Sequence, residues 1–388
     1  MLYFDNAATT PLRSTALEAM MPYLTEQYGN PSGVYSFARK ARRAVEQARE
    51  QVATAIGALP EEIIFTSSCT EANNWALRGV METGHKKHII TTAIEHHAIT
   101  YVCDGLKQQG MDLDVTRLPV NSEGFVSPDD VAAAIRPDTI LISVMWANNE
   151  IGSIQPIEAV AAIAKENGIL LHTDAAQVIG HIPVNVQSVP VDMLTMSAHK
   201  FGGPKGIGAL YLRKGTKLSP FIYGGAQEKN RRAGTENVAG IVGMGEAITV
   251  SVNNMESEHK RVSNLRDTLI NRIESEITHV TLNGPRGDKR LPGNVNFSFA
   301  YIEGESLLLL LDRDSCCASS GSACSSASLE PSHVLMALGA TYERAHGSLR
   351  FTIGHESTME DINGLMAILP KYVAKLRVLS PLMDDELL

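Results

Sequence analysis

Two residues near the middle of the chain, Asp174 and Lys200, have the types and spacing to bind a cofactor together. Each follows a mostly apolar run, at residues 169–171 and 191–196. Such runs are typical of parallel strands, whose carboxyl ends present ligand-binding groups at one edge of a sheet. Pyridoxal phosphate requires an amine that forms an imine and a carboxylate that keeps a ring nitrogen protonated. The pair therefore predicts a pyridoxal-phosphate site.

Neither residue carries this prediction alone, because most lysines are solvated surface charges and most aspartates occupy caps or turns. The segment that follows Lys200, residues 201–208, is rich in glycine. Glycine lets the backbone pass close to a ligand. The amine, the carboxylate and this segment together favour a cofactor site over two unrelated surface residues.

A turn of small hydroxyl residues at 65–71 is the candidate phosphate-binding segment. It joins an apolar strand to a helix that begins near Thr70. Amides at the start of a helix attract anions, but serine and threonine also cap helices without any ligand, so both interpretations stay open. Cys69 is interpreted as a small turn residue rather than a reactive thiol.

Three further residues could contact a cofactor or substrate, and each has a structural alternative. His96 follows an apolar strand and could stack on an aromatic ring and exchange protons, or it could simply begin a helix. Asn149 could donate to a phenolate or carboxylate oxygen, or form an Asx turn. Arg350 stands among apolar residues of a late strand, where its anion is either a substrate carboxylate or a structural salt-bridge partner.

Cys324 lies in a run of small residues, 315–328, that cannot bury much apolar area. A cysteine in such a loop has the solvent access expected of a reactive thiol. Cys316 and Cys317 are expected to pack in a strand, with a vicinal redox pair as the alternative. Because these cysteines lack CxxC or HxxxH partners, we expect no metal site.

The bulk composition indicates a globular protein and argues against several classes. The 388 residues are 44% apolar and 20% charged, and the net charge of -9 argues against a general nucleic-acid binder. No apolar run reaches the length of a membrane span, and the first residues do not resemble a secretory signal. With five scattered cysteines, the chain is expected in the reducing cytoplasm, with no membrane partner.

Strand and helix patterns alternate from residue 63 to residue 212, which predicts an α/β fold. This alternation favours a large domain with a mostly parallel seven-stranded sheet flanked by helices, with ligands at the strand ends. An amphipathic helix near 256–276 then leads into a smaller α+β domain. We expect a large cofactor-binding domain at 16–255, and a small domain, formed by 1–15 and 256–388, that carries the cysteine loop at about 315–330.

Seven motifs occur in order along nearly the whole chain. They are Tyr-Phe-Asp-Asn-Ala-Ala-Thr-Thr at 3–10, Gly-Asn-Pro-Ser at 29–32, Ala-Asn-Asn-Glu-Ile-Gly at 147–152, His-Thr-Asp-Ala-Ala-Gln at 172–177, Ser-Ala-His-Lys at 197–200, Arg-Arg-Ala-Gly-Thr-Glu-Asn at 231–237 and Ser-Ser-Gly-Ser-Ala-Cys at 319–324. Together they resemble the cysteine desulfurases of the nitrogen-fixation and iron–sulfur-assembly type. These belong to the class V aminotransferase group of fold type I pyridoxal-phosphate enzymes.

The resemblance implies a homodimeric enzyme that converts L-cysteine to L-alanine and transfers the sulfur to Cys324 as a persulfide. Lys200 would hold pyridoxal 5'-phosphate as an imine, and Asn149 and Arg350 would take the substrate carboxylate. His96 would stack on the ring and shuttle protons, so that the implied catalytic residues are Lys200, Cys324 and His96. The implied cofactor contacts are Cys69, Thr70, His96, Asn149, Asp174, Gln177, Ser197, His199, Lys200 and, from the other subunit, Thr235.

Other activities remain as alternatives to this interpretation. A selenocysteine lyase or another aminotransferase-like enzyme would use the same cofactor, although Cys324 favours sulfur transfer. A catalytically silent partner of a sulfur-transfer complex is a third possibility, against which Lys200 argues. The expected partner is a transient protein sulfur acceptor such as a cluster scaffold. The tail after residue 379 is short, which leaves the scaffold contact open. The family usually has Ile and Ala where this chain has Cys316 and Cys317, so the role of these two thiols is also open.

Overall fold

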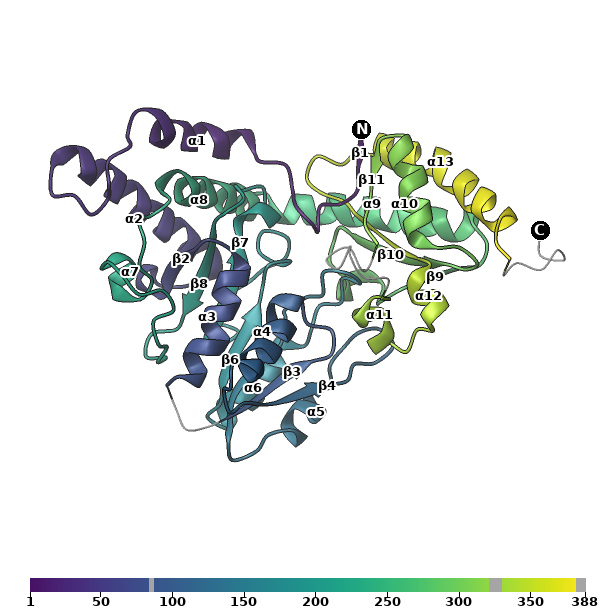
Figure 1. Ribbon diagram of the computed structural model, residues 1–388. Helices are drawn as coiled ribbons and strands as arrows, with labels where there is room; N and C mark the ends of the chain where they lie inside the picture. The colour runs from purple at the N-terminus through teal and green to yellow at the C-terminus, as the bar shows by residue number, and fades with distance from the viewer. Residues whose placement is uncertain (84–86, 321–329, 382–388) are drawn as a thin grey trace.

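The computed structural model describes residues 1–83, 87–320 and 330–381 (Figure 1). Cys324 and most of the expected cysteine loop therefore lie outside the described residues. The described chain contains one seven-stranded sheet, one three-stranded sheet and a two-stranded pair.

The seven-stranded sheet has the order β2-β8-β7-β6-β5-β3-β4. β8 runs antiparallel to both of its neighbours, whereas the pairs among β3, β4, β5, β6 and β7 are parallel. The prediction of a mostly parallel seven-stranded sheet is thus confirmed. The strands are β2 Ile63–Thr66, β3 His88–Thr92, β4 Asp114–Leu118, β5 Thr139–Ser143, β6 Leu170–Asp174, β7 Met193–Ser197 and β8 Gly208–Leu212.

Helices cover both faces of this sheet because successive strand residues point to opposite sides. In β2, Ile63 and Phe65 join a cluster with α2, α6 and α8, whereas Ile64 joins a cluster with α3 and α4. Both clusters are almost fully buried, as expected for a sheet between two helical layers. The helices of this part are α1 Ser14–Thr25, α2 Ser36–Ile56, α3 Cys69–Met81, α4 His97–Gln108, α5 Pro128–Ala133, α6 Ile157–Glu166, α7 Gln227–Asn230 and α8 Val238–Asn253.

The three-stranded antiparallel sheet, in the order β12-β10-β9, forms a second layer with long helices (Figure 1). Phe4 packs in this layer's hydrophobic cluster, so the N-terminal strand lies beside the last helix, α13. β1 pairs in parallel with β11, which contains Cys316 and Cys317, as their predicted strand requires. The elements are β1 Leu2–Tyr3, α9 Met255–Glu276, β9 Val280–Leu282, β10 Asn294–Phe299, α10 Gly304–Arg313, β11 Cys316–Cys317, α11 His333–Ala337, α12 Tyr342–His346, β12 Ser348–Thr352 and α13 Met359–Val378.

A small apolar cluster joins the two parts. Ile94, Met145 and Ile151 come from loops of the large sheet, and Val334 and Leu335 come from α11. We propose that the chain forms two domains. The clusters on the two faces of the seven-stranded sheet would form the core of 16–255, and the cluster of the three-stranded sheet would form the core of 1–15 with 256–388. In the three described ranges, no helix is both long and apolar enough to cross a membrane.

Candidate active site

The ends of β6 and β7 open onto a cavity of about 430 Å³. β6 ends at Asp174, and β7 ends at Ser197, directly before a 3-10 turn at Ala198–Lys200. The predicted site residues that line this cavity are Cys69, Thr70, His96, Asn149, Asp174, Gln177, Ser197, His199, Lys200 and Arg350. Thr235 lines a separate cavity of about 160 Å³, and Cys324 lies outside the described residues.

Asp174 is 7% exposed, and neighbouring donors fix both of its carboxylate oxygens. Asn73 Nδ2 donates to Oδ2 at 2.6 Å, and the Ala176 amide donates to Oδ1 at 3.0 Å. The Thr195 hydroxyl in turn donates to Asn73 Oδ1 at 2.5 Å, which orients the amide. Sequence reasoning missed Asn73; its position one helical turn after Cys69 was the available signal.

Cys69 begins α3 and lies against the same carboxylate. Its Sγ is 3.5 Å from Asp174 Oδ1, to which the thiol donates. Burial, and then the nearby Asp174 charge, raise the pKa of Cys69 well above its usual range. The thiol is therefore protonated, which agrees with its interpretation as an unreactive turn residue.

Lys200 projects toward the N-terminal arm of the chain. Its Nζ donates to the carbonyl oxygens of Ala7 at 2.5 Å and Ala8 at 2.8 Å. Gln177 Nε2 donates to the same Ala7 oxygen at 3.1 Å. The N-terminal arm, residues 3–10, therefore lies within the candidate site and brings the amine and Gln177 together.

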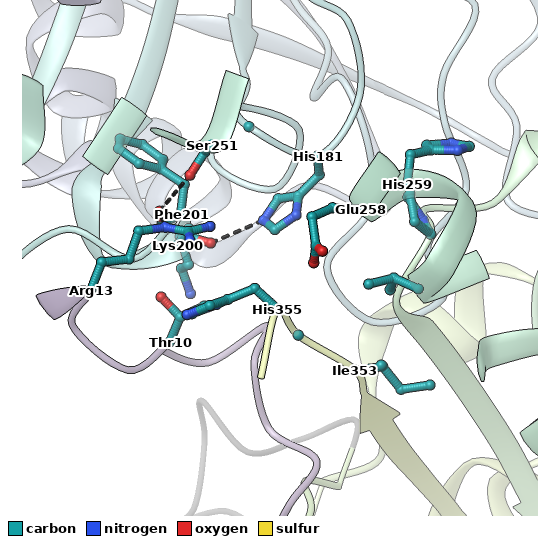
Figure 2. A pocket seen from close by; sticks show the side chains of 14 residues that line it. Thr10, Arg13, His181, Lys200, Phe201, Ser251, Glu258, His259, Ile353 and His355 are labelled. Atoms are coloured by element: carbon teal, nitrogen blue, oxygen red, sulfur yellow. Dashed lines mark hydrogen bonds between the residues drawn. The ribbon is translucent and has the colours of Figure 1, made fainter. Parts of the chain in front are cut away.

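A smaller cavity, of about 40 Å³, lies beside the backbone of Lys200 (Figure 2). Figure 2 shows His181 pointing at this backbone, and its Nε2 donates to the Lys200 carbonyl at 3.0 Å. The Ser251 hydroxyl, from α8, donates to the Phe201 carbonyl at 2.9 Å. Both contacts fix the chain that carries the amine.

The start of α3, the candidate phosphate-binding segment, lies at the cavity. Ser68 caps the helix, with its hydroxyl accepting from the Glu71 amide at 3.1 Å, while Thr70 lines the cavity. A Cβ on Gly208 would lie 2.7 Å from the Ser68 carbonyl carbon, so only glycine lets this helix start approach β8. The same turn therefore caps α3 through Ser68 and lines the cavity through Thr70.

His199 and His96 are both held neutral in the cavity. Burial and the charges of Lys200 and Lys205 lower the pKa of His199 to about 4. Burial also lowers the pKa of His96, against the opposing effect of Asp174. His96 Nδ1 accepts from the Ala98 amide at 3.1 Å, so this residue caps α4 as well as lining the cavity.

Arg350, on β12, is 5% exposed and forms the opposite end of the cavity. Its Nη2 lies 2.9 Å from Asp5 Oδ1, and its Nη1 donates to the Asn149 carbonyl at 3.0 Å. Its buried Nε has no hydrogen-bond partner within the described ranges. The salt-bridge interpretation is thus correct for Asp5, and one buried donor remains for a second anion.

Glu150 is a cavity residue that sequence reasoning missed, although it lies in the motif at 147–152. Burial raises the pKa of Glu150 to about 7, and burial also raises the pKa of Glu95 to about 8. Both carboxyls lie close to the cavity-lining residues His96 and Asn149 in the sequence.

Among the residues that the structure describes, no group of three or more His, Cys, Asp or Glu side chains could hold a metal ion.

Comparison with known proteins identifies the family. The sequence matches the family Aminotransferase class-V over residues 2–365. The chain belongs to the class-V aminotransferase family. The cysteine desulfurase IscS of Dictyoglomus turgidum is 56% identical over 382 residues, which cover 98% of this chain and 96% of that protein. A cysteine desulfurase of a Nostoc species is 46% identical over 387 residues, with coverage of 100% and 96%.

Solved structures give the same result for the fold. A NifS-like protein superposes with a TM-score of 0.88 at 36% identity, covering 97% of this chain and 98% of that chain. The structure of SspA in complex with cysteine gives a TM-score of 0.81 at 37% identity, covering 91% and 99%. The resemblance drawn from the seven motifs is therefore confirmed at the level of family and fold.

Proposed function

We propose that this chain is a pyridoxal-phosphate-dependent cysteine desulfurase that converts L-cysteine to L-alanine and takes the sulfur on Cys324. The observation that carries the proposal is that an amine, a carboxylate and a buried guanidinium, those of Lys200, Asp174 and Arg350, line one and the same cavity. Relatives named cysteine desulfurase, 56% and 46% identical over nearly the full chain, support the same activity.

The residues of the cavity fit pyridoxal phosphate. The start of α3 beside Gly208 suits the phosphate, with further donors from Thr70, Ser197 and His199. Asp174, fixed by Asn73, would face the ring nitrogen, and Gln177 would face the ring hydroxyl. When bound, this cofactor stabilises negative charge at the Cα of an amino acid.

Arg350 and Asn149 would bind the substrate carboxylate. The Nε of Arg350 is a buried donor that lacks a partner in the described chain, so a carboxylate there would satisfy it. Lys200 would remove the Cα proton once the substrate amine has replaced it. His96, whose pKa burial lowers, is neutral and can accept and return a proton at the same face.

Cys324 supplies the nucleophile in this proposal. Its thiolate attacks the substrate sulfur, so that an S–S bond forms as the Cβ–S bond breaks. The electron pair of the broken bond stays with Cβ, which then takes a proton. The products are L-alanine and an enzyme persulfide, which passes to a protein acceptor that supplies iron–sulfur clusters or other thio-cofactors.

A homodimer in the cytoplasm belongs to the same proposal. Thr235 lines a cavity other than the one that holds Lys200, which supports its role toward the other subunit. The first helix and the chain after it also expose large apolar side chains that a partner would cover. These are Leu17, Met21, Leu24, Tyr28, Val34 and Tyr35.

The deciding experiment measures sulfide and L-alanine from L-cysteine with the cofactor-loaded protein, with and without reductant. Cys324→Ala is expected to lose sulfide release by at least about a hundredfold, because the sulfur acceptor is removed. The visible absorption band of the bound cofactor should remain. Cys317→Ala is the matched control and should retain activity.

Three results would contradict this function. Full sulfide release by Cys324→Ala would exclude the thiol as the acceptor. Faster turnover of L-selenocysteine, or amino-group transfer to 2-oxo acids, would favour the alternative activities. Absence of a borohydride-trappable cofactor on Lys200 would exclude a pyridoxal-phosphate enzyme.

A further inference from the structure

Glu150 occupies a fixed position between the cavity and the small domain. Its amide donates to Asn148 Oδ1 at 2.8 Å. Its carbonyl accepts from two buried asparagines of β10, Asn294 and Asn296, both at 3.0 Å. The backbone of this residue is therefore held from the large sheet on one side and from the small sheet on the other.

The side chain of Glu150 contacts Ser332, which directly precedes α11 and stands eight positions after Cys324 in the sequence. The hydroxyl of Ser332, which is 4% exposed, donates to Glu150 Oε2 at 2.5 Å. The same hydroxyl accepts from the Leu335 amide at 3.2 Å and so caps α11. A buried carboxyl that lines the cavity thus fixes the first turn of this helix.

α11 is too short to be stable by itself, so its contacts determine its position. His333 Nε2 donates to the Glu95 carbonyl at 2.9 Å. Val334 and Leu335 pack in the small apolar cluster that joins the two parts of the molecule. Apolar contacts are less directional than hydrogen bonds, so they fix the position of a helix less strictly. The bond between Ser332 and Glu150 gives α11 a directional contact with the cavity lining, beside its apolar contact with Met145, which also lines the cavity.

The residue before Glu150 links this contact to the expected substrate position. The carbonyl of Asn149 accepts from Arg350 Nη1 at 3.0 Å. The dipeptide Asn149–Glu150 therefore touches the guanidinium with one residue and α11 with the other. The contact with α11 therefore lies one residue from the expected substrate position.

We propose that Glu150 is a positioning residue for sulfur transfer, which acts through Ser332 to hold α11, the first described helix after Cys324 in the sequence, against the cavity lining. The proposal rests on the desulfurase function above. It assigns to Glu150 a role in the transfer step and none in binding L-cysteine itself. The expected effect of breaking the contact is therefore on kcat, with KM for L-cysteine nearly unchanged.

The test compares Ser332→Ala, Ser332→Thr and Thr341→Ala in the cofactor-loaded protein. Ser332→Ala is expected to lower kcat for alanine formation about tenfold, the effect of one lost hydrogen bond, with KM changed less than twofold. Ser332→Thr keeps the hydroxyl and should restore at least half of kcat. Thr341 caps the neighbouring α12 without touching Glu150, so its alanine variant loses a similar cap and should keep wild-type kcat.

Hydrogen exchange gives a readout that does not depend on activity. Ser332→Ala and Glu150→Ala should each speed exchange of the α11 amides, and the double variant should exceed neither single variant by more than about twofold. Glu150→Gln keeps an acceptor oxygen and should preserve protection. These measurements separate the contact from a general loss of stability.

The outcomes distinguish this inference from the proposed function. An active wild-type protein whose Ser332→Ala variant keeps full kcat would overturn the positioning role. Equal losses in Ser332→Ala and Thr341→Ala would also overturn it, because any lost cap would then suffice. Wild-type protein without desulfurase activity would overturn the function, whereas unchanged α11 exchange in Glu150→Ala would overturn the contact itself.

Discussion

The two ends of the cavity are built in different ways. At the lysine end, Asp174 and Lys200 follow neighbouring parallel strands, whose pairing places His172 beside Met193 and Asp174 beside Thr195. At the arginine end, Asp5, Asn149 and Arg350 come from three segments that are distant in the sequence. The register of the large sheet forms the first end, whereas packing of the N-terminal arm and of β12 from the three-stranded sheet forms the second.

The N-terminal arm is the element that the two ends share. Asp5 pairs with Arg350, while the carbonyls of Ala7 and Ala8 accept from Lys200. The arm is also held by Thr10, whose hydroxyl donates to the His199 carbonyl at 2.9 Å. A change at one end is therefore expected to reach the other mainly through this arm, and less through the rigid sheet.

The largest effect is expected at Glu95, which directly precedes His96 and holds the chain at Met145, both of which line the cavity. Its buried Oε1 accepts from the Met145 amide at 2.9 Å and from the Thr92 hydroxyl at 2.8 Å. Burial raises its pKa from 4.5 to about 8, so the folded state binds the proton more tightly than the unfolded state. The contribution of this carboxyl to the free energy of unfolding is therefore fully present below pH 4.5 and is lost as pH rises through 8.

Glu95→Gln keeps the acceptor oxygen and removes the titration. Relative to wild type, the variant should become more stable as pH rises, by about 3–5 kcal/mol between pH 4.5 and pH 9. Urea unfolding across this pH range measures the difference. Parallel stability curves for the two proteins would show that the carboxyl is not kept protonated by burial.

A smaller effect is expected at Asn73, which tests the lysine end alone. Asn73→Ala removes the donor to Asp174 Oδ2 and leaves the Thr195 hydroxyl without its acceptor. We expect kcat to fall about tenfold, with a stability loss of about 1–3 kcal/mol. The adjacent Asn74→Ala is the control, since Asn74 donates to the Thr70 carbonyl within α3. Equal activity in both variants would contradict a preformed carboxylate.

The smallest effect is expected at Asp5, which tests the arginine end. Asp5→Asn keeps an oxygen that accepts from Arg350 and removes the negative charge that offsets the guanidinium. KM for L-cysteine should fall about two- to fivefold, because a partly exposed ion pair is worth up to about 1 kcal/mol. Asp129→Asn, on exposed α5, changes the net charge equally and should leave KM unaltered. A raised KM would show that Asp5 mainly orients the arginine.

Most of the fold and one end of the site were predictable from local patterns. The alternation after residue 63 predicted the parallel sheet, because strand and helix periods are local properties of the sequence. The antiparallel direction of β8 was not part of that prediction, since chain direction depends on the connection through the 3-10 turn at Lys200. Asn73 was missed because its position one helical turn after Cys69 was the only local signal, and its partners Asp174 and Thr195 lie far away in the sequence.

The sequence by itself indicated the family and predicted that Asp174 and Lys200 would lie at one cavity. Asp174 and Lys200 stand at strand ends, and the edge of a parallel sheet brings such residues together whatever the rest of the chain does. Only the tertiary structure decided the surroundings of Arg350 and Glu150. Their partners, Asp5 and Ser332, lie far away in the sequence, and such contacts form only when the N-terminal arm and α11 pack against the large sheet.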